Sequence, residues 1–143
     1  MSSECVFCRI IKGEIPCAKL YENNDIIAFL DIMPAVKKGG HTLVVPKKHY
    51  EFITDMPDEL IAKAMSAAKR IACAVMKEAD GVNILLNNGK AAGQYVPHVH
   101  FHIVPRYKGD KIGLAHWEAL KYRKGEMEKV QERIKKLFEE GIC

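Results

Sequence analysis

The stretch from His98 to Val104 alternates histidine with apolar residues, and this pattern restricts the fold more than any other in the chain. Successive side chains of a β-strand point to opposite faces, so the pattern predicts a strand with three imidazoles on one face. Val99, Phe101 and Ile103 would then point into the core on the other face. The chain has six histidines among 143 residues. Composition alone would produce such a run about 0.01 times per chain, so the pattern calls for a chemical explanation.

Further strand signals and one long helix account for most of the remaining chain. Short apolar runs at 18–21, 26–30, 41–45 and 82–86 predict four more strands, and the polar residues 22–25 predict a hairpin between the first two. Apolar periodicity over 61–79 predicts a long amphipathic helix, and shorter helices are expected at 6–11 and 126–140. The histidine strand is expected to end at Pro105. Short connections between the strands favour an antiparallel α+β domain over a parallel βαβ arrangement.

Composition limits the classes of protein to which the chain can belong. Its 143 residues are expected to form a single domain, 1–143, in which 108–143 is an extension. The net charge of +4 comes without a long basic stripe, so we expect no nucleic-acid partner. No apolar run is long enough for a membrane span. Five cysteines, an odd number, in a chain that begins without a signal-like segment favour the reducing cytoplasm.

Three interpretations of the histidine row compete. Imidazoles at alternate strand positions could hold a catalytic zinc ion. One neutral imidazole could instead attack an electrophile while its neighbours set its tautomer and stabilise negative charge. The third interpretation is a set of structural, hydrogen-bonded histidines. The glycine-containing loop 87–94 lies just before the row and can bring backbone N–H groups to an anion, which favours phosphate chemistry.

The pair Cys5-x-x-Cys8 has the spacing of half a tetrahedral zinc site, although the spacing does not identify the other ligands. A redox role would suit a position after a strand in a βαβ unit, and the sequence indicates no such unit. Free thiols are the remaining alternative.

Several stretches together resemble the signature segments of the histidine triad family. They are 98–102 with the preceding Ala92-Gly93-Gln94, the segment from Gly40 to His49, the segment from Phe29 to Ile32, and the opening from Cys5 to Ile11. The resemblance extends from about Cys5 to Tyr107. It implies an antiparallel sheet with one long central helix and N- and C-terminal helices, assembled as a homodimer.

The resemblance also implies roles for individual residues. His100 would attack the α-phosphorus, with His102 on the phosphate and His41 beside the triad. A structural zinc ion would be held by Cys5, Cys8, His49 and His98, and no metal would be required at the reacting phosphorus. The nucleotide-binding residues would be Asp31, Ile32, Asn87, Gly93, Gln94 and Tyr95. Tyr95 stands where many relatives have serine or threonine, and the loop 31–41 is two residues longer than usual.

The implied activity is hydrolysis of purine nucleoside 5′-phosphoramidates or related nucleotides through a covalent nucleotidyl-histidine. The alternative within the enzyme class is a dinucleoside polyphosphate hydrolase. The alternative outside the enzyme class is a nucleotide-binding regulatory or adaptor protein with vestigial catalysis. The last alternative is a zinc hydrolase that uses the triad as metal ligands.

Overall fold

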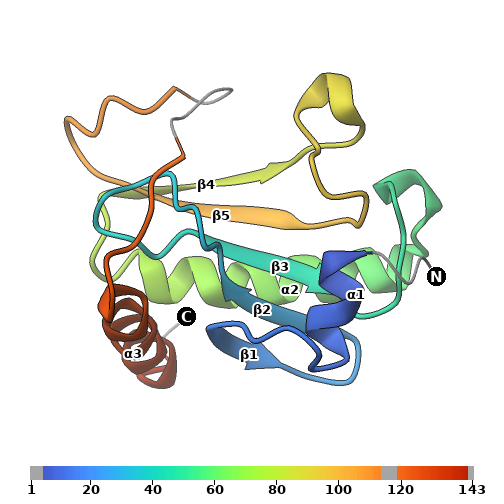
Figure 1. Ribbon diagram of the computed structural model, residues 1–143, viewed down its shortest axis with the longest axis horizontal. Helices are drawn as coiled ribbons and strands as arrows, with labels where there is room; N and C mark the ends of the chain where they lie inside the picture. Colours follow the sequence, from blue (N-terminus) through green and yellow to red (C-terminus); the bar gives the residue numbers. More distant parts are fainter. Residues whose placement is uncertain (1–4, 114–118, 142–143) are drawn as a thin grey trace.

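The computed structural model describes residues 5–113 and 119–141, which form one sheet and three α-helices (Figure 1). The strands are β1 (Lys19–Glu22), β2 (Ile26–Leu30), β3 (Thr42–Pro46), β4 (Gly81–Leu86) and β5 (Phe101–Arg106). The helices are α1 (Val6–Ile11), α2 (Asp58–Val75) and α3 (Glu126–Glu139), with short 3₁₀ turns η1 (Ile53–Asp55) and η2 (Lys90–Ala92). The predicted antiparallel α+β fold is confirmed.

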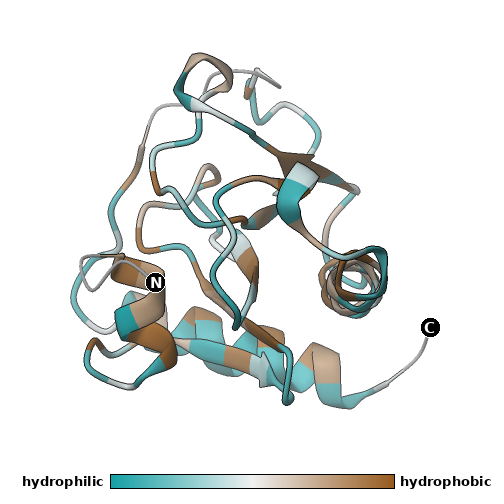
Figure 2. Ribbon diagram, turned by 90° about the vertical axis from the view of Figure 1, so that its right-hand side faces the viewer, coloured by the Kyte–Doolittle hydropathy of each residue, from teal (hydrophilic) through white to brown (hydrophobic). Residues whose placement is uncertain are grey.

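The sheet has the order β1-β2-β3-β5-β4, and every neighbouring pair is antiparallel. Its two faces carry separate apolar clusters, so β2 and β3 are buried on both sides. Ala28 and Val44 pack on one face with α2, whereas Phe29 and Leu43 pack on the other with the residues of α1. Figure 2 shows α1 and α2 on opposite sides of the sheet. This burial explains why these strands are continuous apolar runs rather than alternating ones.

The long helix α2 is confirmed but is shorter than predicted. It begins at Asp58 with two acidic residues in its first turn, where they complement the helix dipole. It ends at Val75 instead of Ala79, because the backbone N–H of Glu78 and of Ala79 both bond to the Val75 carbonyl in a turn that leads into β4. Periodicity cannot detect this end, since Ala79 still packs against the core.

The predicted extent of the histidine strand is wrong at both ends. The segment 96–100 precedes the strand: the His98 N–H bonds to the Val96 carbonyl, and the Val99 N–H bonds to the Tyr50 carbonyl. These bonds replace sheet partners, so β5 begins only at Phe101. Pro105 does not end it, because Pro105 pairs with Val82 of β4. The apolar half of the prediction is confirmed, since Val99, Phe101 and Ile103 all lie in the core beside α2.

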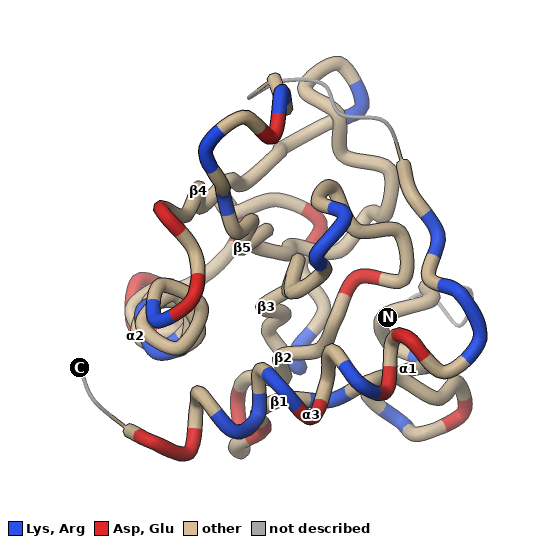
Figure 3. The backbone as a smooth tube through the Cα atoms, turned by 90° about the vertical axis from the view of Figure 1, so that its left-hand side faces the viewer, with Lys and Arg blue, Asp and Glu red and all other residues tan. Residues whose placement is uncertain are grey.

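Helix α3 packs against the end of α2 and against β1. Val130 and Ile134 point into the main core, and charged residues of both signs alternate along the remaining surface of the helix (Figure 3). No helix in the described part of the chain is long and apolar enough to cross a membrane.

Candidate active site and metal site

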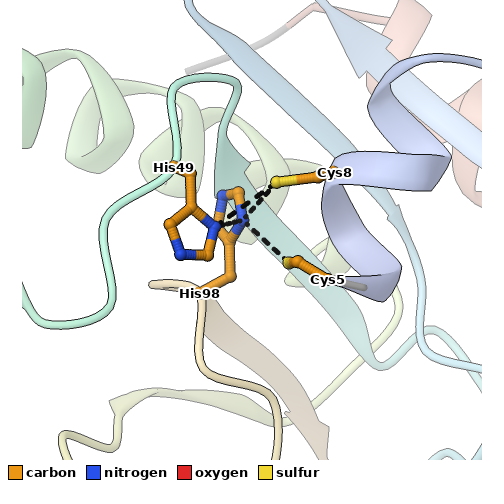
Figure 4. A group of neighbouring side chains, drawn as sticks. All are labelled: Cys5, Cys8, His49 and His98. Atoms are coloured by element: carbon orange, nitrogen blue, oxygen red, sulfur yellow. Dashed lines mark hydrogen bonds between the residues drawn. The ribbon is translucent and has the colours of Figure 1, made fainter. Parts of the chain in front are cut away.

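Four predicted metal ligands from three separate parts of the chain meet at one point (Figure 4). Cys5 and Cys8 flank the first turn of α1, His49 follows β3, and His98 lies just before β5. The Cys5 Sγ to His98 Nδ1 distance is 3.4 Å, and the Cys8 Sγ to His49 Nδ1 distance is 3.3 Å. The two Nδ1 atoms of His49 and His98 are 3.1 Å apart, and Cys8 Sγ lies 3.6 Å from His98 Nδ1.

These distances fit the edges of a zinc tetrahedron. Zinc–sulfur bonds of about 2.3 Å and zinc–nitrogen bonds of about 2.0 Å place neighbouring ligand atoms about 3.3–3.8 Å apart. His98 also has the required tautomer: its Nε2–H donates to the Pro46 carbonyl at 2.7 Å, which leaves the Nδ1 lone pair for the cluster. The Cys₂His₂ donor set is therefore one that zinc favours, and four protein ligands describe a structural site.

Burial determines the protonation of Cys8 and His98 when no cation is nearby. It raises the pKa of the Cys8 thiol to about 11 and lowers the pKa of His98 to about 4. His98 is accordingly a neutral imidazole, as a metal ligand must be. A bound cation would supply the positive charge that a buried thiolate lacks, so metal binding and deprotonation of the cysteines are coupled.

His100 is held as a neutral imidazole with a defined tautomer. Its Nδ1 lies 2.7 Å from the carbonyl oxygen of His98, and because a carbonyl can only accept, Nδ1 carries the proton. Burial lowers the pKa of His100, so the ring is neutral at physiological pH. The remaining nitrogen, Nε2, therefore has a free electron pair and is the nucleophilic atom of this residue.

His41 and His102 form a relay beside His100. The Ala35 N–H donates to His41 Nδ1 at 3.0 Å, so the proton of neutral His41 is on Nε2 and is donated to His102 Nδ1 at 2.9 Å. His102 consequently carries its own proton on Nε2. The His102 ring centroid is 4.8 Å from that of His100, so this N–H group belongs to a ring packed beside His100.

Asp31, His41 and His102 form a second group that could hold a metal ion. The tautomer of His41 argues against this use. Burial lowers the pKa of His41 to about 3, and its Nε2 is protonated because its Nδ1 accepts the Ala35 N–H. A protonated nitrogen has no lone pair for a metal. The arrangement therefore suits a hydrogen-bond relay better than a catalytic zinc site built from the triad.

Phe7 links the two groups of histidines, and our sequence reasoning did not single it out. Its ring makes edge contacts with His98 at a centroid distance of 5.9 Å and with His100 at 5.0 Å. In the sequence, only the position of Phe7 between Cys5 and Cys8 could have indicated these contacts. This position places Phe7 on the face of the sheet where the two cysteines lie. The helix that bears the cysteines thus also packs on the nucleophilic histidine.

The predicted nucleotide-binding residues lie on two loops, one directly after β2 and one between β4 and β5. Asp31 ends β2: its N–H donates to the His41 carbonyl at 2.8 Å, and its side chain lies 3.7 Å from His41 Nε2. Burial raises the pKa of Asp31. The neighbouring Ile32 is 67% exposed, so an apolar surface remains uncovered beside this carboxylate.

The second loop, 87–94, is shaped by its own hydrogen bonds. Gln94 is buried; its amide donates to the Glu51 carbonyl and accepts from the Gly89 N–H, each at 2.7 Å. Gly93 has a φ of +92°, and a Cβ at this position would lie 3.5 Å from the Asn87 amide nitrogen. Tyr95 is 92% exposed. Gln94 therefore fixes the loop, while Asn87 and Gly93 approach each other within it.

Comparison with known proteins gives consistent results. The family model of the HIT (histidine triad) domain matches residues 12–109. An uncharacterized HIT-like protein of Methanocaldococcus jannaschii is 53% identical over 107 residues, 74% of this chain and 81% of its own. The adenosine 5′-monophosphoramidase of Saccharomyces cerevisiae is 47% identical over 114 residues, 80% of this chain and 69% of its own.

Among solved structures, a zinc-bound histidine triad family protein from Mycobacterium smegmatis superimposes with a TM-score of 0.84 and 38% identity. The match covers 96% of this chain and 94% of that one. The matched sequence includes the histidine row, and the matched fold includes the sheet that supports it. The chain therefore belongs to the histidine triad family.

Proposed function

We propose that this protein hydrolyses purine nucleoside 5′-phosphoramidates or related nucleotides by way of a nucleotidyl-histidine. The observation that carries the proposal is the tautomer of His100, whose Nδ1–H is fixed on the His98 carbonyl and whose Nε2 is left as a nucleophile. The similarity to an adenosine 5′-monophosphoramidase supports the choice of substrate. The residue roles below follow from this proposal.

In the first step His100 Nε2 attacks the α-phosphorus, a phosphorus–nitrogen bond forms, and the bond to the leaving amine breaks. The amine takes the bonding electrons and a proton from solvent, and the water that attacks in the second step returns a proton to solvent. Water then attacks the same phosphorus, the nucleoside monophosphate is released, and His100 regains its neutral form. The Nε2–H of His102 stabilises negative charge on the phosphate oxygens, and the His41 hydrogen bond keeps His102 in the required tautomer.

The zinc ion proposed for Cys5, Cys8, His49 and His98 supplies structural cross-linking. It joins α1 to the segments that precede β5 and follow β3. The reacting groups of the proposed mechanism are side chains of the protein, so the reaction requires no metal at the phosphorus. Asp31 is proposed to bind the ribose hydroxyls, with Ile32 against the sugar or base.

The test is hydrolysis of adenosine 5′-phosphoramidate by the wild-type protein and by the His100→Gly variant. We expect release of AMP and ammonia by the wild type and a loss of at least ~10⁴-fold in the variant, because the nucleophile is gone. Added imidazole should restore part of the activity. Equal rates in the two proteins would refute the mechanism. Diadenosine tetraphosphate, assayed in parallel, distinguishes the phosphoramidase from the dinucleoside polyphosphate hydrolase.

We further propose that the chain acts as a homodimer through β4 and α2. Strand β4 is at the edge of the sheet, and three large apolar side chains near it are 40–54% exposed: Met65, Met76 and Ile84. Met65, Met76 and Ile84 line one groove. A second copy would cover this apolar surface and the edge strand. Light scattering should give twice the chain mass, and Ile84→Lys should reduce it to the monomer; a monomeric wild type would refute the dimer.

A further inference from the structure

The C-terminal helix α3 contacts the loop that leads into His41. This helix lies outside residues 12–109, the part of the chain that the HIT domain model matches. Arg133 donates through Nη2 to the Lys38 carbonyl at 2.7 Å, and through Nε to Glu78 at 3.0 Å. Lys38 is three residues before His41. One guanidinium thus joins α3, the turn after α2 and the loop that ends at the histidine relay.

Two glycines of this loop lie close to the C-terminal segment, and at Gly39 there is no room for a side chain. A Cβ on Gly39 would be 2.8 Å from the Tyr122 hydroxyl and 3.0 Å from Val130. A Cβ on Gly40 would be 3.4 Å from Ile134 Cδ1. Both glycines have positive φ, +79° and +92°, a conformation that favours glycine, and at Gly39 the close approach requires it as well.

The fixed loop leads directly to the relay. His41 follows Gly40, and its ring accepts the Ala35 N–H from the same loop and donates to His102. The His41 carbonyl also accepts the Asp31 N–H. A shift of the 38–40 backbone would therefore change the position of the His41 ring relative to both His102 and Asp31.

We propose that Arg133, through the Lys38 carbonyl, is a positioning residue for His41. It touches no reacting atom and acts by holding the loop that carries the relay. The inference rests on the proposed function only in its kinetic readout, because the position of the His41 ring can be observed directly.

The decisive variant is Arg133→Met, which keeps the aliphatic stem and removes both hydrogen bonds. The matched control is Lys77→Met. Lys77 also anchors α3 by donating to a carbonyl at 2.7 Å, but its acceptor, the Leu137 carbonyl, belongs to α3 itself and not to the loop before His41. Arg133→Lys is the conservative variant, since an ammonium group can still reach the Lys38 carbonyl.

Two readouts separate positioning from general destabilisation. In Arg133→Met, kcat for adenosine 5′-phosphoramidate should fall about tenfold with KM changed less than about twofold, because small displacements of positioned groups cost about 10- to 100-fold. The imidazole Nε2–H resonance of His41 in ¹⁵N-labelled protein should shift and exchange faster with solvent. Arg133→Lys should recover most of both values, and Lys77→Met should match the wild type.

An unchanged His41 resonance in Arg133→Met would overturn the inference, whether or not kcat falls. An equal effect in Lys77→Met would overturn it as well, because α3 docking alone would then be responsible. If Arg133→Met does not fold, Arg133→Gln, which removes the guanidinium group but keeps a polar side chain, takes its place, and a shifted His41 resonance is again required. An inactive wild type refutes the proposed function, but the resonance still decides the positioning role.

Discussion

Loss of one zinc ligand should detach α1 from the sheet, and Cys8→Ser is the sharpest form of this perturbation. Helix α1 has six residues, and isolated helices shorter than about 12 residues are marginal in water. Its attachment therefore depends on the metal site and on apolar packing, in which the ring of Phe7 is buried and Ile10 and Ile11 are partly buried. Burial of such a ring contributes about 1.5–3 kcal/mol.

The metal contributes more than this ring. A ligand present at about 1,000 times its dissociation constant stabilises the folded state by about 4 kcal/mol. Without that contribution only the apolar contacts hold α1 to the sheet, so α1 should open locally more often. For a domain of this size the melting temperature should fall by about 8–16 °C, since each kcal/mol shifts it by about 2–4 °C.

Three measurements check this prediction: zinc content per chain, calorimetric melting temperature, and hydrogen exchange of the peptide that contains α1. We expect Cys8→Ser to bind little zinc and to lose protection over 6–11. Cys17→Ser is the matched control, because Cys17 is a free, partly buried cysteine against the same apolar cluster but outside the four-ligand group. Equal zinc content and melting temperature in Cys8→Ser and wild type would refute the reasoning.

Three further results are expected. Gly39→Ala should lower the free energy of unfolding by about 1–3 kcal/mol, because a Cβ would meet Tyr122 at 2.8 Å; Gly13→Ala, with the same φ of +79° but open space, should cost less in the same denaturation assay. His102→Leu should lower kcat about 100-fold by removing the donor proposed for the phosphate, and an unchanged kcat would contradict that role. The folded-state pKa values of His41 and His102 are about 3 and about 4, below the ordinary value of 6.5. Between pH 4 and pH 6.5 the unfolded chain therefore binds more protons than the folded chain. The contribution of these two histidines to the free energy of unfolding should therefore be fully present above pH 6.5 and decrease as the pH is lowered toward 4. Urea denaturation of zinc-saturated protein should show a smaller decrease with pH in His102→Gln.

The sequence was sufficient to predict most of the fold because the signals were local. Apolar runs of strand length and the periodicity of α2 are properties of neighbouring residues, and their predicted positions agree with the structure within a few residues. The boundaries of the histidine strand were wrong because they depend on distant partners. The Val99 N–H bonds to the Tyr50 carbonyl, a contact across 49 positions that no local pattern contains.

The candidate site divides in the same way. The spacing of Cys5 and Cys8 predicted half of a metal site, and only the family resemblance added His49 and His98, which the structure brings to the cysteines. The contact of Phe7 with His100 required the path of α1 over the sheet. The hydrogen bond from Arg133 to the Lys38 carbonyl joins residues 95 positions apart, so composition and periodicity could not indicate it.

In the proposed mechanism His100 Nε2 is the nucleophile, and intact-protein mass spectrometry after brief exposure to adenosine 5′-phosphoramidate can detect the covalent intermediate. The reaction is stopped at alkaline pH in denaturant, where a phosphorus–nitrogen bond to imidazole persists. We predict a mass increase of one adenylyl group in the wild-type chain, mapped to His100 in the peptide that contains the histidine row, and none in His100→Gly. Rapid turnover with no adduct at any time point, or an adduct on another residue, would contradict the account.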